Sequence, residues 1–308
     1  MFNKFKASLP GFDITPLLKS LKESLTEQSG EALEPRDKPS CELVQVREGK
    51  LPAVFIINGF LSENNVCSKD WLDVVDELYP TNKVIRVEWK AGNLTDMVFD
   101  KGAVPNIPAS RNGKLGFAAM VAARSTILGI ASTVGAFVVD KVAGHWKRSF
   151  HETRHVASGL ASYLEQQPEF ENCILMGHSL GGRIVRHTLN ELVRSNLVSV
   201  AYVFAGAVSS EDEQWQEVFE KHSQLKLINC MSKKDYVLKS AYKVGTLWDH
   251  EPAGLSPVMV QHIHTLNLDV TMYAKGHTEF KQKELGEYLK SELSLLEKDK
   301  LAMLHISD

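Results

Sequence analysis

A serine in a Gly-x-Ser-x-Gly spacing is the residue best suited to covalent chemistry in this sequence. Ser179 lies between Gly177 and Gly181 in the run CILMGHSLGGRIV, where an apolar strand pattern changes into an amphipathic helical one. A serine hydroxyl is a weak nucleophile, and a sharp strand-to-helix turn presents it where a histidine can accept its proton. Such a turn brings backbone segments so close that glycine is required on both sides. We therefore expect a nucleophile elbow with Ser179 at its tip, the alternative being an ordinary strand-to-helix turn.

A histidine that takes the serine proton is expected in the loop between the last strand and the final helix. Of the eleven histidines, His277 in the run YAKGHTEF lies there. The preceding Gly276 would permit a close backbone approach, and a helix from Glu279 onward would anchor the loop. His277 is therefore the predicted base, against the alternative of a surface histidine at a helix start. His178, beside the serine, is expected to point away from it and to help pack the turn.

An acid that orients this histidine should follow a strand between the two, because the expected chain order is serine, acid, histidine. Asp235 fits this place, since the run LKLINCMSKKDYVL is an apolar strand that leads into a loop with an acid. A carboxylate there would hold the imidazole in the tautomer that accepts the serine proton. Glu211 and Asp212, after the preceding strand, are the alternative acids, and Asp235 could instead be a solvated loop charge or a helix cap.

Two backbone N–H groups are expected to bind the oxyanion of a tetrahedral intermediate. One belongs to Leu180, directly after the nucleophile, and the other to Phe60 in the loop after the early strand of AVFIINGFLSE. Gly59 would let the chain turn sharply and direct the Phe60 N–H toward the elbow. A plain strand-to-helix turn is the alternative, since Asn58 and Gly59 replace the more usual His-Gly pair.

The elements that must position these residues alternate between strands and helices. This alternation predicts an α/β fold with a mostly parallel sheet and helices on both faces. The expected strands are Ala53–Ile57, Val84–Trp89, Cys173–Met176, Val198–Ala205, Leu225–Met231 and Leu266–Met272. The expected helices are Ser68–Leu78, Lys147–Glu165, Gly181–Arg194, Asp212–Lys221 and Glu279–Glu297.

Two segments depart from this alternation. Residues 1–40 predict an N-terminal amphipathic helix followed by a linker, and residues 41–308 are expected to form the main domain. A long apolar insertion at about 92–144 separates two strands by more than a usual connection. Within it, 115–139 is rich in small and apolar residues, and its only charge is Arg124. This helical segment is interpreted as a mobile lid, a membrane-inserting hairpin or a buried cap.

Composition and charge exclude other classes. The formal net charge of -3 indicates no nucleic-acid partner, since phosphate binding relies on clustered cations. The four cysteines lack metal spacing and are expected to be reduced, and His262 and His264 have no third ligand at a suitable spacing. We therefore expect neither a metal nor another cofactor.

No secretory signal is recognised, so a cytoplasmic protein is expected, soluble or peripherally associated with a membrane.

Several blocks of this sequence resemble the α/β-hydrolase superfamily and, within it, the hydrolase-like domain of transmembrane and coiled-coil domain-containing proteins. The blocks span about Leu51 to Leu289 and are NGFLSE followed by Trp71, RVEW ending at Trp89, GHSLGGR, NCMSKKDYVL, and EPAGLSPV leading to GHTEF. The resemblance implies an α/β-hydrolase fold, a triad of Ser179, Asp235 and His277, and a frequent association with membranes and lipids.

These patterns together predict a serine hydrolase that cleaves carboxylic esters through an acyl-enzyme. Lipid or acyl substrates of a lipase or phospholipase are favoured, because the insertion is apolar and lies between strands at the catalytic edge of the sheet. The expected partners are therefore an ester or lipid and a membrane surface. The alternatives are a soluble small-ester or thioester hydrolase and a non-catalytic membrane-interaction protein that keeps the fold.

Overall fold

The computed structural model describes residues 41–60, 62–63, 67–92, 136–211, 213–239 and 251–306. The predicted N-terminal helix within 1–40 and residues 93–135 of the predicted insertion lie outside these ranges. Within the described ranges, no helix is both long enough and apolar enough to span a membrane.

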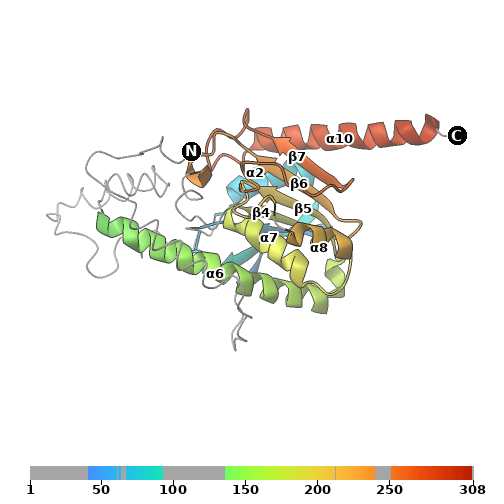
Figure 1. Cartoon of the computed structure of the whole chain (residues 1–308). Coiled ribbons are helices and arrows are strands. Elements are labelled where there is room, and N and C mark those ends of the chain that lie inside the picture. Colours follow the sequence, from blue (N-terminus) through green and yellow to red (C-terminus); the bar gives the residue numbers. More distant parts are fainter. Residues whose placement is uncertain are drawn as a thin grey trace.

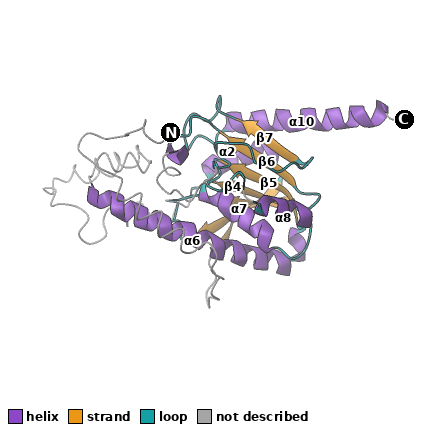
Figure 2. Cartoon of the chain, viewed as in Figure 1, coloured by secondary structure: helices purple, strands orange, loops and turns teal. Residues whose placement is uncertain are grey.

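One seven-stranded sheet forms the centre of the described chain, in the order β1-β3-β2-β4-β5-β6-β7 (Figures 1 and 2). All neighbouring strands are parallel except β1, which is antiparallel to β3 at one edge. The strands are β1 Cys41–Arg47, β2 Lys50–Ile57, β3 Asn82–Trp89, β4 Cys173–His178, β5 Val198–Phe204, β6 Lys226–Met231 and β7 Thr265–Asp269. This strand order, with its single antiparallel edge, is that of the α/β-hydrolase fold.

Helices cover both faces of this sheet, as predicted (Figure 1). One face is covered by α6, α7 and α8, whose buried side chains form one apolar cluster with the strands. The other is covered by α2 and α10, which belong to a second cluster. The bounds are α2 Lys69–Leu78, α6 Ala136–Gln166, α7 Leu180–Glu191, α8 Gln214–Lys221 and α10 Lys283–Ile306, with a short 3-10 helix at Pro168–Phe170.

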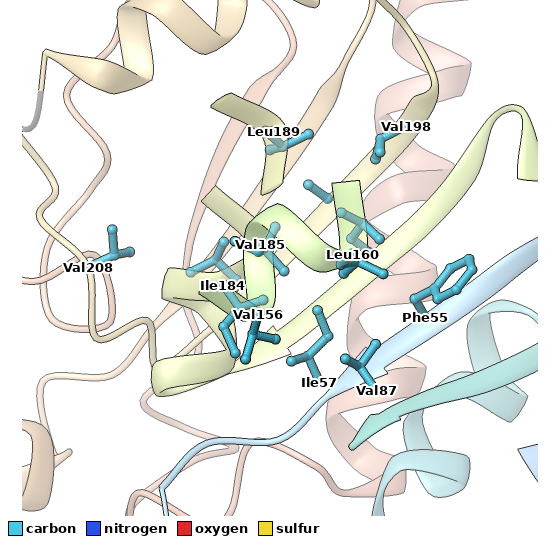
Figure 3. Close-up of a cluster of buried hydrophobic side chains, with 14 of the residues drawn as sticks. Phe55, Ile57, Val87, Val156, Leu160, Ile184, Val185, Leu189, Val198 and Val208 are labelled. Atoms are coloured by element: carbon cyan, nitrogen blue, oxygen red, sulfur yellow. The ribbon is translucent and has the colours of Figure 1, made fainter. Parts of the chain in front are cut away.

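The alternation of side chains along β2 builds both clusters. Phe55 and Ile57 pack toward α6 and α7 (Figure 3). Val54 and Ile56 pack toward α2 on the opposite face. All four are fully buried. Successive side chains of a strand point to opposite faces, so a parallel strand covered on both faces reads as one continuous apolar run. That is why β2 and β4 could be predicted from their continuous runs of apolar residues.

The chain reverses its direction of travel across the sheet between β2 and β4. From β2 it passes through α2 to β3 on one side, and it then returns through α6 to β4 on the other. Ligand sites of open α/β sheets form beyond the carboxyl ends of the strands at such a switch point. Here β2 ends at Ile57, just before Asn58 and Gly59, and β4 ends just before Ser179.

The elements differ from the sequence prediction at their edges. The edge strand β1 was not predicted, because its side chains are half-buried and mix apolar with polar residues. β7 ends at Asp269 rather than Met272, since the Asp269 carboxylate accepts the Thr271 N–H in a turn. α10 starts at Lys283 rather than Glu279, because the Glu279 side chain accepts the Lys275 N–H in the preceding loop. Finally, α6 begins at Ala136, inside the predicted insertion.

Candidate active site

Ser179 occupies a strained turn between β4 and α7. Its φ is 58° and its ψ is -118°, a conformation that costs a non-glycine residue about 1–3 kcal/mol. The surrounding backbone holds it there. Its N–H donates to the Phe204 carbonyl at 2.9 Å, and its carbonyl accepts from Ala207 and Gly182, both at 3.0 Å. A strained and anchored serine at a strand-to-helix turn is the geometry expected of a nucleophile elbow.

Both glycines that flank the turn are required by close backbone contacts. A Cβ atom on Gly177 would lie 2.3 Å from the Gly181 carbonyl oxygen. A Cβ atom on Gly181 would lie 2.2 Å from the carbonyl oxygen of Ile57, at the end of β2. Any larger residue would therefore force β4, α7 and β2 apart at the elbow.

Asp235 and His277 are brought together by loops that follow β6 and β7. The His277 Nδ1 lies 2.7 Å from Asp235 Oδ2, and the Asp235 side chain is fully buried. The other carboxylate oxygen of Asp235 accepts the Leu238 N–H at 2.9 Å. Because a carboxylate accepts, Nδ1 carries the proton in this pair, which leaves Nε2 of the neutral ring able to accept another one.

The described structure gives neither alternative acid, Glu211 or Asp212, a contact with His277. Glu211 has an exposed side chain at a surface hollow lined also by Met259, whereas Asp212 lies outside the described residues. Of the two candidate acids that the structure describes, Glu211 and Asp235, it is Asp235 that pairs with His277.

No hydrogen bond joins Ser179 Oγ to the His277 ring in the described structure, where that ring bonds to Asp235. Catalytic contacts of this kind are often long without substrate and tighten when it binds.

The close backbone approach expected at Gly276 is wrong. A Cβ atom on Gly276 would meet only the Glu279 carboxylate, at 3.5 Å.

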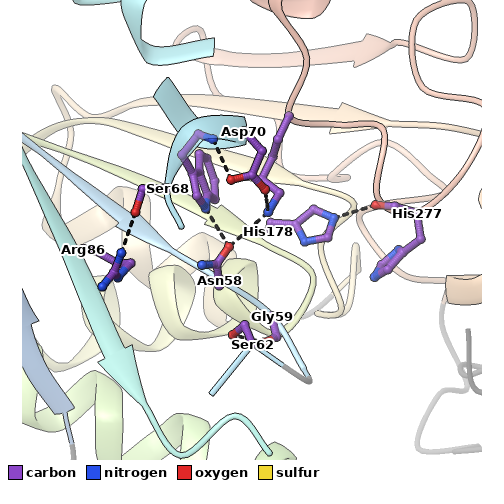
Figure 4. A network of polar contacts seen from close by, with 10 residues as sticks. Asn58, Gly59, Ser62, Ser68, Asp70, Arg86, His178 and His277 are labelled. Atoms are coloured by element: carbon purple, nitrogen blue, oxygen red, sulfur yellow. Dashed lines mark hydrogen bonds and ion pairs between the residues drawn. The ribbon is translucent and has the colours of Figure 1, made fainter. Parts of the chain in front are cut away.

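His178 does more than pack the turn. Its Nε2 donates to the backbone carbonyl of His277 at 2.7 Å, and the two rings lie 4.8 Å apart between their centroids (Figure 4). Burial lowers the pKa of His178 well below its ordinary value, and the charges of His277 and Lys281 lower it further. A neutral imidazole with its proton on Nε2 satisfies this geometry.

The loop after β2 runs against the serine, as expected for an oxyanion loop. A Cβ atom on Gly59 would lie 2.6 Å from Ser179 Cβ and 3.2 Å from Ser179 Oγ. Phe60 follows directly in this loop. Leu180 is the first residue of α7, where the backbone N–H has no carbonyl partner within the helix. The two backbone N–H groups predicted to bind an oxyanion therefore belong to segments on either side of the serine.

Asn58 and Lys281 complete the site, and sequence reasoning gave neither a role. The Asn58 Oδ1 accepts from Trp71 Nε1 at 2.7 Å and from Lys281 Nζ at 3.1 Å. The Asn58 backbone carbonyl accepts from Trp89 Nε1 at 3.0 Å. The Asn-Gly pair, in place of the usual His-Gly, was visible in the sequence. Nothing in the sequence around Lys281 indicates that it contacts Asn58.

Within the described ranges, no three His, Cys, Asp or Glu side chains gather in a way that could hold a metal ion. The His262 ring stacks on Phe219 with centroids 4.2 Å apart, and the His264 ring meets the His262 ring edge-on. These two histidines take part in aromatic packing.

The sheet order and the strand-to-helix elbow define a protein with an α/β-hydrolase fold. By sequence, the chain belongs to the family described as "Protein of unknown function (DUF726)", whose match covers residues 103–292. The finer resemblance, to the hydrolase-like domain of transmembrane and coiled-coil domain-containing proteins, stays a prediction.

Three solved structures illustrate what this chain is similar to. Alpha/beta hydrolase domain-containing protein 10 from mouse is 14% identical, with 87% of this chain and 98% of that chain covered and a TM-score of 0.39. A lipase-esterase related protein from Clostridium acetobutylicum is 11% identical, with coverages of 83% and 98% and a TM-score of 0.38. Est1E from Butyrivibrio proteoclasticus is 11% identical, with coverages of 83% and 92% and a TM-score of 0.38.

Proposed function

We propose that this protein is a serine hydrolase that cleaves carboxylic esters through an acyl-enzyme. The observation that carries the proposal is the Asp235–His277 hydrogen bond, at the same edge of the sheet as the strained Ser179. A buried carboxylate on a histidine beside a serine elbow is the combination that serine hydrolysis requires.

In the proposed reaction, His277 Nε2 accepts the Ser179 proton as Oγ attacks the ester carbonyl carbon. The carbonyl π electrons move to oxygen, and the Phe60 and Leu180 N–H groups bind the resulting oxyanion. The tetrahedral intermediate collapses, the ester C–O bond breaks, and the imidazolium returns its proton to the leaving alkoxide. Water then attacks the acyl-enzyme with the same base, which releases the acid and restores Ser179. Asp235 stabilises the imidazolium at both steps.

The substrate we propose is a lipid or another long-chain acyl ester bound at a membrane surface. Support comes from the sequence, since 115–139 is apolar and its only charge is Arg124. Residues 115–135 of this stretch lie outside the described ranges, and 136–139 begin α6.

Turnover across a chain-length series of p-nitrophenyl esters, with Ser179→Ala as the blank, tests the activity and the substrate class. We expect Ser179→Ala to be inactive, turnover to increase with acyl length, and liposomes to increase it further. A preference for short esters would favour the small-ester alternative. Absence of turnover on all esters would favour a non-catalytic protein.

The double variant Ile127→Asp with Ile130→Asp tests the membrane surface separately. A charged side chain inserts poorly into a lipid surface, so this variant should bind liposomes less tightly and lose their stimulation. It should hydrolyse a short soluble ester at the parent rate. Liposome binding equal to that of the parent would contradict the membrane role.

A further inference from the structure

Three segments of the chain meet at the ammonium group of Lys281. Its Nζ donates to Asn58 Oδ1 at 3.1 Å, forms an ion pair with Asp70, and lies 5.4 Å from the centre of the Trp71 ring. Asn58 belongs to the loop after β2, and Asp70 and Trp71 belong to the first turn of α2. Lys281 itself follows the loop that carries His277, so one cation connects three elements around the elbow.

This cation is largely buried. The Lys281 side chain is only 12% exposed, whereas the Asp70 side chain is 44% exposed. A charge removed from water is costly unless it is paired and hydrogen-bonded. The Asp70 carboxylate, the side-chain amide oxygen of Asn58 and the Trp71 ring provide these contacts. A buried charge satisfied by three partners holds its position far more tightly than an exposed lysine does.

Asn58 transmits this position to the nucleophile. Its Oδ1 is fixed by two donors from different elements, Trp71 and Lys281, and its backbone carbonyl is fixed by Trp89. The next residue, Gly59, lies so close to the elbow that a Cβ atom on it would be 2.6 Å from Ser179 Cβ and 2.9 Å from the His178 carbonyl oxygen. The path of the chain through Gly59 to the Phe60 N–H is therefore determined at Asn58.

The same cation fixes the loop of the base. Lys281 follows Phe280, which is fully buried and whose ring lies 6.1 Å from the ring of His178. His178 in turn holds the His277 carbonyl. Lys281 and His178 therefore anchor the 277–281 segment to two sides of the elbow.

We propose that Lys281 is a positioning residue that ties the oxyanion loop at Asn58–Phe60 to the loop of the base at His277. This inference rests on the proposed serine hydrolysis and names a component that no local motif indicates. Lys281 acts through Asn58 and touches neither the substrate nor the reacting atoms. With Lys281 in place, the oxyanion donors and the imidazole are held in one arrangement, which reduces the rearrangement needed in the transition state.

Lys281→Met tests the proposal, because methionine keeps an unbranched apolar stem and removes the charge and the donor. We expect kcat for a short soluble ester to fall about 10–100-fold, as for a displaced oxyanion donor. KM should stay within about two-fold, since positioning acts on the transition state. The affinity for a trifluoromethyl ketone, which forms an oxyanion adduct, should fall by the same factor as kcat. Lys281→Arg, which keeps charge and donors, should recover part of the loss.

Lys283→Met is the matched control, because Lys283 starts α10, is 62% exposed and pairs only with Glu77 and Glu287 among the described residues. Its kinetics should equal those of the parent. If Lys281→Met does not fold, Asp70→Asn replaces it, since that change loosens the ammonium without emptying its site, and kcat should fall in the same direction. A parent-like kcat in the folded Lys281→Met variant would overturn the positioning role. If Lys281→Met does not fold, a parent-like kcat in Asp70→Asn would overturn it.

Hydrogen exchange of the amides at 58–60 and 275–279 gives a readout that does not depend on activity. These amides should exchange faster in Lys281→Met than in Lys283→Met, and equal exchange would also contradict the proposal. Failure of the proposed function is distinguishable, because it shows as Ser179→Ala turnover equal to that of the parent, or as no turnover by the parent.

Discussion

The His178 ring donates a hydrogen bond from Nε2 to the backbone carbonyl of His277 at 2.7 Å. The residue directly before the candidate nucleophile therefore holds the backbone of the candidate base. The side chain of His277 is oriented independently, through its hydrogen bond to Asp235. The base is thus fixed at two points, its main chain by β4 and its ring by the loop after β6.

Replacing His178 should disturb the base without touching the serine. His178→Ala leaves the His277 carbonyl without its donor, and we expect a loss of about 1–3 kcal/mol in unfolding free energy together with a lower kcat. His178→Gln places an amide N–H at a similar reach and should recover most of both. Urea unfolding and ester kinetics check this. Equal behaviour of the two variants would contradict the hydrogen-bond role.

Stability should fall on mild acidification, because buried histidines must be protonated when the chain unfolds. Burial lowers the pKa of His178 and of His187 well below 6.5, and the charges of Arg186, Arg183 and Arg154 lower that of His187 further. Between the folded and unfolded pKa values the unfolded chain binds more protons, so stability rises with pH there. It is therefore lost as the pH falls below about 6.5.

The slope below that pH should reach about 1.4 kcal/mol per pH unit for each such histidine. Urea unfolding at pH 7.5 and at pH 5.5 measures the loss. His187→Gln, which cannot be protonated, should reduce the difference between the two pH values. An unfolding free energy that is constant or larger at pH 5.5 would be inconsistent with neutral buried rings.

The glycines of the site should not be equivalent. Gly59→Ala places a methyl group 2.6 Å from Ser179 Cβ, and Gly181→Ala places one 2.2 Å from the Ile57 carbonyl. Both should lower kcat/KM by more than about 100-fold, since a displacement of about 1 Å at a reacting group has effects of that size. Gly276→Ala meets only the Glu279 side chain at 3.5 Å and serves as the control. Parent-like kinetics of Gly59→Ala would show that the loop does not approach the serine.

The fold, and the positions of three candidate residues within it, could be predicted because their signals are local. A continuous apolar run marks a doubly covered strand, and Ser179, Asp235 and His277 each lie in a recognisable place after a strand. The contact between Asn58 and Lys281 joins residues 223 positions apart and exists only because β2 and the last loop end at the same edge. β1 was missed for a related reason, since an edge strand with mixed side chains gains its structure from pairing with β3.

Asp235 should be essential, whereas the alternative acid should not. Asp235→Asn keeps the shape of the side chain but favours the wrong histidine tautomer, and a loss of about 10⁴ in kcat is expected. Glu211→Gln is the matched control, because Glu211 is exposed and His277 pairs with Asp235. Steady-state ester kinetics distinguish them. An inactive Glu211→Gln beside a nearly parent-like Asp235→Asn would mean that the acid is assigned wrongly.

Covalent labelling by a fluorophosphonate tests the central claim most directly, because the reagent phosphonylates only a serine that has been activated as a nucleophile. Intact-mass spectrometry should show one adduct on the parent protein, and peptide mapping should locate it at Ser179. Ser179→Ala removes one oxygen from the elbow and should stay folded and unlabelled. An unlabelled parent, or a Ser179→Ala variant labelled as strongly as the parent, would contradict the account.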